Sequence, residues 1–233
     1  MIIKTLASSS KGNAYIVSDG KTSILLEAGI TIRELRNKAG FRLYELSACF
    51  VTHEHKDHSK ACEELLKHGL DVYMTKGTSE MLEIENANII QAKKSFRVGS
   101  LTILPFDTQH DCAEPVGFLI ESNRTKERLL FATDTYYIKY RFSGLNYIMI
   151  ECNYDLDILN ANVEAGKLPL AMKSRVLKSH FSIENVIKFL KANDLKDVVK
   201  IYLLHLSDGN SNEKEFKKKI ETEFYKEVEV CKA

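Results

Sequence analysis

A cluster of potential metal-binding side chains occupies Val51–His58, which reads Val-Thr-His-Glu-His-Lys-Asp-His. Three imidazoles and an aspartate follow an apolar stretch and precede an expected helix. The turn from strand to helix would bring these four side chains together. Imidazole nitrogen and carboxylate oxygen suit zinc, manganese or iron, whereas calcium and magnesium favour all-oxygen ligand shells. With 7 histidines in 233 residues, the pattern His-x-His-x-Asp-His should occur by chance in roughly 3 of 10,000 chains of this composition. The pattern therefore predicts a metal site rather than a solvated polar loop.

Short apolar and β-branched runs, separated by turn residues, dominate the first half of the chain. Thr31 and Glu34 stand at capping-box spacing, and Gly40 can end the helix that they begin. A second helix is expected from about Ser59 to His68. The expected strands are residues 2–6, 14–17, 23–26, 48–51, 72–74, 101–106, 117–121 and 129–132.

Helices and strands also alternate in the second half. Apolar residues recur at helical spacing from Ile183 to Leu190, after the potential cap Ser182. Strands are expected over residues 198–204 and 228–230. Two batches of strands, each followed by helices, predict two packed sheets covered by helices, in a single domain over residues 1–233. The last helix would begin after Asn212 and bury Phe216, Ile220 and Phe224.

Composition excludes several classes of protein. The 33 basic and 32 acidic residues give a net charge of +1, so affinity for a polyanion must come from a local patch. No apolar run approaches the ~20 residues that span a bilayer. The amino terminus does not resemble a secretory signal, which favours a cytoplasmic location. The 5 cysteines form no CxxC pair and are expected to be reduced thiols.

The motif at His53, His55, Asp57 and His58 resembles the signature of the metallo-β-lactamase superfamily, and the resemblance extends along nearly the whole chain. It implies an α+β four-layer αββα sandwich, the metallo-β-lactamase fold. It also assigns three further ligands, each after an expected strand or apolar run: His110, Asp134 and His205.

The resemblance implies two divalent metal ions, zinc or manganese, with iron also open. A pair about 3.5–4 Å apart would lower the pKa of a shared water and clamp the oxygens of an in-line displacement. The implied ligands are His53, His55 and His110 for one ion, Asp57, His58 and His205 for the other, and Asp134 between them.

The bridging residue narrows the substrate class. Many true β-lactamases of this fold are exported and have cysteine at the position of Asp134. The aspartate form is shared by phosphodiesterases, nucleases and glyoxalase II-like thioesterases. Antibiotic hydrolysis is therefore disfavoured.

Three segments look like the YycJ/WalJ-type branch of the superfamily, whose small bacterial and phage proteins are associated with exonuclease activity on DNA: residues 7–14, 151–155 and 173–182. The branch pattern makes His180 a candidate general acid for the leaving oxygen. An equally weighted alternative is that His180 positions the following helix or contacts phosphate without transferring a proton.

Residues 167–178 carry four basic and no acidic side chains. Lys173 and Arg175 are the expected phosphate contacts, while Lys167 and Lys178 fit an ordinary solvated face equally well. Asn153 is a further expected substrate contact.

Two residues of the first hairpin, Ser10 and Asn13, could bond ligands or substrate, or only shape the turn. Glu27 stands where the family has an aspartate, whose role is to accept the second N–H of a metal-bound histidine. Tyr136 replaces a glycine common in the branch, which would narrow the cleft.

These features favour a dinuclear phosphodiesterase, most simply a DNA exonuclease, in which Asp57 orients or deprotonates the attacking water. The alternatives are a glyoxalase II-like thioesterase or lactonase and a non-catalytic metal-binding regulatory module. The metal, the choice among DNA, RNA and a small phosphodiester, and the polarity of cleavage remain open. The segment between Asp134 and His205 is too short for an inserted second domain, so surface grooves or a homodimer would supply specificity for a long substrate.

Overall fold

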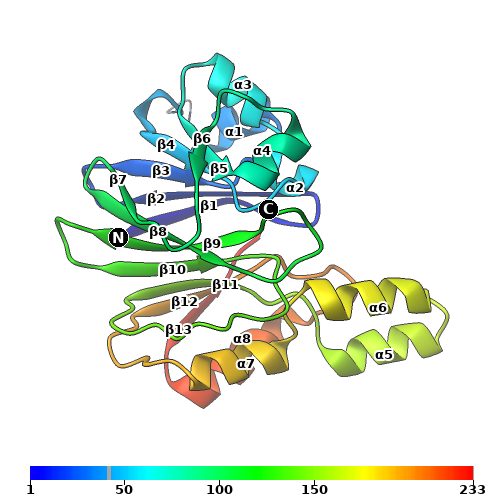
Figure 1. Cartoon of the computed structure of the whole chain (residues 1–233). Helices are drawn as coiled ribbons and strands as arrows, with labels where there is room; N and C mark the ends of the chain where they lie inside the picture. The colour runs from blue at the N-terminus through cyan, green and yellow to red at the C-terminus, as the bar shows by residue number, and fades with distance from the viewer. Residues whose placement is uncertain (41–42, 233) are drawn as a thin grey trace. The chain divides into compact units, whose positions relative to one another are not determined.

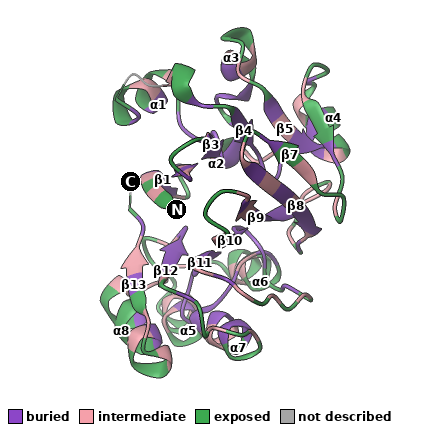
Figure 2. Cartoon of the chain, turned by 90° about the vertical axis from the view of Figure 1, so that its left-hand side faces the viewer, coloured by how far each residue is buried: buried purple, intermediate pink, exposed green. Residues whose placement is uncertain are grey.

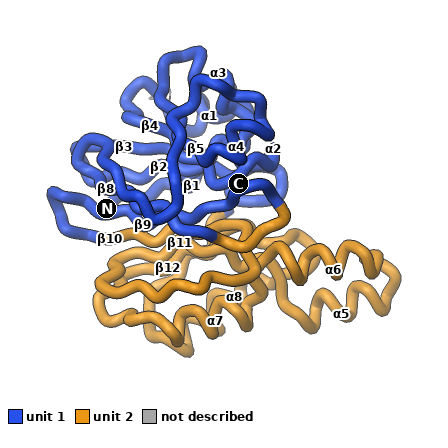
Figure 3. Tube along the Cα trace, viewed as in Figure 1, with its two compact units in different colours: residues 1–107, 112–127, 232–233 blue, residues 108–111, 128–231 orange. Residues whose placement is uncertain are grey.

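The chain is described by a computed structural model that covers residues 1–40 and 43–232. It divides into two compact units, shown in blue and orange in Figure 3. Unit 1 comprises residues 1–107, 112–127 and 232, and unit 2 comprises residues 108–111 and 128–231.

A six-stranded sheet forms the centre of unit 1 (Figure 1). Its first three strands are antiparallel neighbours, and the next three continue the sheet in parallel. The strands, in spatial and chain order, are β1 (Ile2–Ser9), β2 (Gly12–Ser18), β3 (Ser23–Leu26), β4 (Ala48–Phe50), β5 (Val72–Thr75) and β6 (Asn88–Ile90).

Helices cover one face of this sheet. Leu35 of α1 (Ile32–Lys38) and Leu65 of α3 (Cys62–Lys67) belong to a buried cluster with Leu25 of β3. Burying these apolar side chains supplies the main driving force for docking the helices on the sheet. The remaining helical segments of unit 1 are η1 (Leu43–Glu45), α2 (Lys56–Ser59) and α4 (Lys76–Leu82).

A second group of strands in unit 1 packs on the other side of the core. Phe50 of β4 lies 5.7 Å from Phe118 and 5.9 Å from Phe96, measured between ring centroids. These aromatic contacts join the two β layers within the unit. The strands of the second layer run antiparallel and are β7 (Phe96–Val98), β8 (Leu101–Asp107) and β9 (Val116–Ser122).

Unit 2 is built on four parallel strands, with helices in the connections after the second and the third of them. The elements are β10 (Arg128–Ala132), β11 (Tyr147–Glu151), α5 (Leu156–Glu164), α6 (Leu170–Ser179), α7 (Ile183–Lys191), β12 (Lys200–Leu204), α8 (Glu213–Phe224) and β13 (Glu227–Val230). Strands β10, β11 and β12 are buried after their first residue, as expected for parallel strands with both faces covered, whereas the edge strand β13 is mostly half-buried (Figure 2).

Several helix starts and stops agree with the sequence. The capping box at Thr31 is formed with Glu34, and the caps Ser182 and Asn212 accept the expected backbone hydrogen bonds. Gly40 has a φ of 70° directly after the first helix, a conformation that glycine adopts without strain. Phe224 differs from expectation because it is only half-buried, whereas the other two apolar residues of its helix are buried.

The helix expected over residues 59–68 is wrong in extent, since the chain forms two short helices, α2 and α3. The peptide of Ala28 explains the break. Its N–H donates to the carbonyl of His58 at 2.7 Å, and its carbonyl accepts from the N–H of Ala61 at 2.8 Å. These bonds take up groups that a continuous helix would use internally.

Among residues 1–40 and 43–232, no helix has the length and apolar character needed to cross a bilayer.

Candidate metal centre

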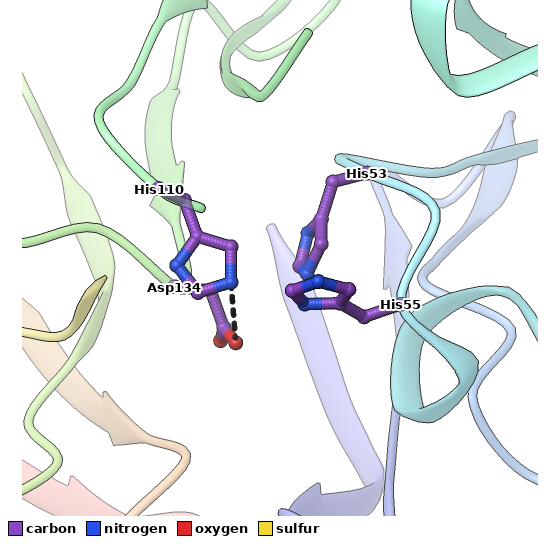
Figure 4. A group of neighbouring side chains, drawn as sticks. All are labelled: His53, His55, His110 and Asp134. Atoms are coloured by element: carbon purple, nitrogen blue, oxygen red, sulfur yellow. Dashed lines mark ion pairs between the residues drawn. The ribbon is translucent and has the colours of Figure 1, made fainter. Parts of the chain in front are cut away.

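The four ligands expected in unit 1 follow strand β4 and enter helix α2. His53 and His58 are buried, and their ring centroids lie 4.2 Å apart. His55, at the start of α2, lies 4.7 Å from His53 in an edge-to-face arrangement, visible in Figure 4. Asp57 is partly exposed, with a carboxylate oxygen 3.3 Å from Nε2 of His58. The structure thus brings these four side chains together within unit 1.

His58 is held between a buried carboxylate and a buried amide. Oε2 of Glu27 lies 3.6 Å from Nδ1 of His58, and the side-chain nitrogen of Asn13 lies 3.2 Å from Nε2. Asn13 also donates to the carbonyls of Ser9 and Asp57. Its position supports the alternative in which it positions a ligand, while Ser10 is exposed at the hairpin turn.

Glu27 lies where the resemblance requires a partner for a metal-bound histidine. It is completely buried, and burial raises the pKa of its carboxyl, while contact with His58 opposes that rise. Its other near contact is the N–H of Thr52, at 3.4 Å. Oε1 accepts no hydrogen bond from the described residues. The side chain of Glu27, one methylene longer than the family's aspartate, therefore fits behind His58 with few hydrogen-bond partners.

Gly29 allows the loop after β3 to approach the ligand turn. A Cβ placed on this residue would lie 1.7 Å from the carbonyl oxygen of Asp57, a separation that no side chain tolerates. The N–H of Gly29 donates to the carbonyl of Asn13 at 2.8 Å. The glycine thus lets three segments of unit 1 meet at the ligands.

Unit 2 contains the other three expected ligands, two of which follow its parallel strands. Asp134 follows β10, and His205 follows β12 directly. One carboxylate oxygen of Asp134 lies 3.1 Å from Nδ1 of His205, and the other lies 3.7 Å from Nε2 of His110, the ion pair dashed in Figure 4. Nδ1 of His110 lies 2.8 Å from the carbonyl of Ser179, which favours the tautomer with Nε2 as the metal-facing nitrogen.

Glu151 is a central residue of this set that the sequence analysis did not assign. It ends strand β11 and is completely buried. Oε1 lies 2.5 Å from Nδ1 of His180 and 3.2 Å from Nδ1 of His205. Oε2 accepts hydrogen bonds from the backbone of Thr135 and Phe181. The available signal was an acidic residue directly after an apolar strand, the same context as Glu27.

The protonation equilibria of unit 2 follow from these contacts. Burial favours a neutral Glu151, but the charge of His180 and the hydrogen bonds from both histidines hold its pKa below the usual value. Burial would lower the pKa of His180, and the facing Glu151 carboxylate raises it instead. The pKa of His110 is lowered by burial, which favours the neutral imidazole that metal binding requires.

Two expected ligands and one carboxylate behind a ligand adopt left-handed backbone conformations. The φ angles are 65° at Glu27, 44° at Asp134 and 52° at His205. For residues other than glycine this conformation costs on the order of 1 kcal/mol or more and concentrates at functional sites. Each of the three lies just after a buried strand.

The other residues expected to contact substrate lie in different parts of unit 2. Asn153 is buried, and its side chain donates to the carbonyl of His205 at 2.9 Å, so it positions a ligand. Lys173 and Arg175 lie on α6, where Arg175 is 58% exposed and donates to Asp111 at 2.9 Å. Tyr136 lies at the surface, 39% exposed.

The donor chemistry fits metal ions. In unit 2, ligand atoms of Asp134, Glu151, His180 and His205 all lie within 4.8 Å of one another. In unit 1, three imidazoles and one carboxylate gather in one turn. Mixed nitrogen and oxygen donors suit zinc, manganese and iron.

Comparisons with known proteins agree with the fold. A family model described as Beta-lactamase superfamily domain matches residues 22–205. Exodeoxyribonuclease YycJ of Bacillus anthracis is 32% identical over 226 residues, covering 89% of this chain and 83% of that protein. Exodeoxyribonuclease WalJ of Streptococcus pneumoniae is 29% identical over 225 residues, covering 88% and 81%. The metallo-beta-lactamase fold protein YhfI from Bacillus subtilis superposes with a TM-score of 0.76 at 16% identity, covering 99% of this chain and 95% of that chain.

The chain therefore belongs to the β-lactamase superfamily and has the metallo-β-lactamase fold that the sequence predicts. It is a metal-dependent hydrolase. The expected resemblance to the YycJ/WalJ-type branch is confirmed. That the whole chain forms a single domain stays a prediction.

Proposed function

We propose that the chain is a DNA exonuclease that cleaves phosphodiester bonds with two divalent metal ions, zinc or manganese, with iron as a further candidate. The observation that carries this proposal is the 32% identity to a protein named exodeoxyribonuclease, over most of both chains. The histidine and aspartate sets supply the donors that such chemistry needs.

The proposed ligands of the metal pair are those that the family pattern assigns. Bound ions would supply Lewis-acid activation of a water and of the scissile phosphate. Glu27 and Glu151 would hold ligand histidines from behind, a role that outer carboxylates commonly fill in metal sites. The family pattern gives His53, His55 and His110 to one ion, Asp57, His58 and His205 to the other, and Asp134 to both.

Two residues would act on the attacking water and on the leaving oxygen. The partly exposed carboxylate of Asp57 would orient the attacking water or accept its proton. His180 would donate a proton to the leaving oxygen from Nε2, because Glu151 engages its Nδ1. This pairing of a histidine with a buried carboxylate fixes the orientation of the ring.

The basic face of α6 would help to hold the substrate. Lys173 and Arg175 lie on this helix, whose ten residues include three basic and no acidic side chains. Contacts of this kind position the phosphate backbone without reading the bases. The cytoplasmic location and the homodimer expected from the sequence remain predictions.

A cleavage assay tests the proposal. The protein, loaded with Mn²⁺ or Zn²⁺, is incubated with end-labelled double-stranded DNA, single-stranded DNA and RNA, and with a thioester substrate. We expect stepwise loss of nucleotides from a DNA end, abolished by chelator. Turnover of the thioester alone would show that the proposed substrate class is wrong.

Variants from each unit identify the site. Asp57→Ala and His110→Ala should each reduce DNA cleavage by about 1,000-fold or more, since each removes a ligand donor of the proposed pair. His68→Ala is the matched control, because His68 is an exposed histidine outside both ligand sets. Folded Asp57→Ala and His110→Ala proteins with wild-type activity would contradict the proposed site.

A further inference from the structure

A cavity of about 340 Å³ lies in unit 2, apart from the residues assigned above to proton transfer. One wall is residues 137–141, which follow the ligand Asp134 in the chain, and the other is Phe181 with helix α7. The volume is within the range of small-molecule sites. We call this cavity the aromatic groove.

The lining of the aromatic groove is strongly aromatic. Ile138, Phe181 and Phe189 are buried and contribute its apolar inner surface. Tyr137 is 55% exposed and Tyr140 is half-buried. Exposed aromatic rings beside an apolar floor provide flat faces on which other rings can stack.

Three cations accompany these rings. Lys139, Arg141 and Lys188 line the groove, and all three are exposed. Nζ of Lys139 lies 5.2 Å from the ring centroid of Tyr140, a cation–π distance. Among the described residues that line the groove there is no aspartate or glutamate. The lining therefore suits a ligand with negative charge and flat rings.

Hydrogen bonds connect both walls of the aromatic groove to Glu151, which contacts the ligand histidine His205. Oε2 of Glu151 accepts the N–H of Thr135 at 3.0 Å and the N–H of Phe181 at 3.1 Å. Thr135 continues the connection, since its hydroxyl donates to the carbonyl of Tyr137 at 2.9 Å. The carboxylate that faces His180 thus also holds the start of each wall.

The far end of the wall is also fixed. The N–H of Phe142 donates to Asn193 at 2.6 Å, just beyond the end of α7, and Asn193 donates to the carbonyl of Phe189. A segment bonded at both ends can present its rings and cations in constant positions, which lowers the entropic cost of binding.

We propose that the aromatic groove binds the single-stranded end of the DNA substrate, with bases stacked on Tyr137 and Tyr140. Lys139, Arg141 and Lys188 contact its phosphates. This inference deepens the proposed nuclease function and rests on it. Stacking on aromatic rings tolerates any base, because every base has a flat face. An exonuclease that removes successive nucleotides needs this tolerance, so a duplex substrate must open its end before it enters the groove.

Binding measured without cleavage tests the proposal. Fluorescence anisotropy of a labelled oligothymidine is recorded in chelator, beside an abasic strand of equal length and a blunt duplex. Wild type should bind the oligothymidine more tightly than either competitor. Tyr137→Ala should weaken that binding by roughly 5- to 150-fold, the equivalent of about 1–3 kcal/mol per stacked base, and leave binding of the abasic strand unchanged. Tyr137→Phe keeps the ring and should keep the affinity.

The phosphate contacts have their own signature. Lys188→Ala should reduce the slope of log affinity against log salt by about 0.7, the value for one phosphate contact on a single strand. Tyr44→Ala and Arg33→Ala are matched controls, because both side chains are exposed on unit 1, and both variants should bind as wild type.

The outcomes separate the groove from the nuclease activity. Wild-type affinity of Tyr137→Ala for the oligothymidine, or equal binding of the abasic strand, would overturn the proposal even if the enzyme digests DNA. Binding that depends on Tyr137 in a protein that cleaves no DNA would support the groove and contradict the nuclease proposal.

Discussion

In unit 1 the buried Glu27 meets one histidine, whereas in unit 2 the buried Glu151 meets two. Glu27 has a raised pKa because burial dominates, and Glu151 has a lowered pKa because its partners outweigh burial. The pKa of the same residue type is thus shifted in opposite directions behind the two ligand sets. The difference teaches that the number of donors around a buried carboxylate decides in which direction its pKa moves.

The two ligand sets also differ in how the chain assembles them. Four expected ligands of unit 1 come from residues 53–58, a single strand-to-helix turn. Unit 2 draws His110, Asp134 and His205 from separate loops. The positions of the unit 1 ligands depend on the fold of one turn. The positions of the unit 2 ligands depend on several strand ends that lie far apart in the sequence.

Replacing each glutamate by glutamine tests this contrast and has the largest expected effect. Glu151→Gln should weaken binding of Zn²⁺ or Mn²⁺ by about 100-fold, and Glu27→Gln by about 10-fold, the two ends of the usual range for outer carboxylates. The effect at Glu151 is larger because two histidines and two backbone N–H groups lose their anionic partner. Isothermal titration of the folded variants measures both affinities. Equal losses of metal affinity in the two variants would contradict the contrast between Glu27 and Glu151.

The buried asparagines of the two sets provide a second, smaller contrast. Asn13 donates to two carbonyls and accepts from Tyr15, whereas the side chain of Asn153 donates to the carbonyl of His205. Asn13→Ala should lower the free energy of unfolding by about 2–3 kcal/mol, and Asn153→Ala by about 1 kcal/mol. Urea unfolding measures both. A larger loss at Asn153 would show that the dispersed set depends on this residue more than its contacts indicate.

A third buried carboxyl, Asp19, extends the comparison of Glu27 and Glu151. It lies just before strand β3, whereas Glu27 lies just after that strand. Burial opposes its ionisation, but bonds from Thr22, Ser100 and Ser122 prevail and hold its pKa well below the usual value. A carboxyl with a depressed folded-state pKa stabilises the fold above its unfolded pKa of about 3.9 and loses that contribution as the pH falls toward the folded-state value.

Asp19→Asn should therefore lower stability by about 1.5–3 kcal/mol at neutral pH, with the difference from wild type shrinking below about pH 4. Chemical unfolding across this pH range measures the effect. Metal affinity at neutral pH should stay unchanged, since Asp19 lies outside both ligand sets. A pH-independent difference would contradict the assigned ionisation.

The sequence was sufficient where the signal is local. The motif of residues 53–58 and the capping box at Thr31 depend on neighbours in the chain, and both occur in the structure. Strands β3 and β8 also lie where their apolar runs predict them. Glu151 escaped assignment because a single acidic residue after a strand carries no spacing pattern. Its role depends on partners that lie 16 to 54 residues away in the chain.

Other misses have similar causes. Strands β6 and β7 are three residues long, too short for an alternating pattern to be recognised. Helices α5 and α6 expose much of their surface, so their apolar periodicity is weak, and α4 was also not expected. The break between α2 and α3 depends on the peptide of Ala28, a tertiary contact that no local rule contains.

The central claim is the proposed pair of metal ions, with Asp134 as a ligand of both. Its most direct test is equilibrium dialysis followed by elemental analysis of wild type and Asp134→Ala. The account predicts two ions of Zn²⁺ or Mn²⁺ per chain in wild type and weakened binding of both in the variant, because one carboxylate serves both ions. Absence of bound metal in wild type, or two ions held at wild-type affinity by Asp134→Ala, would contradict it.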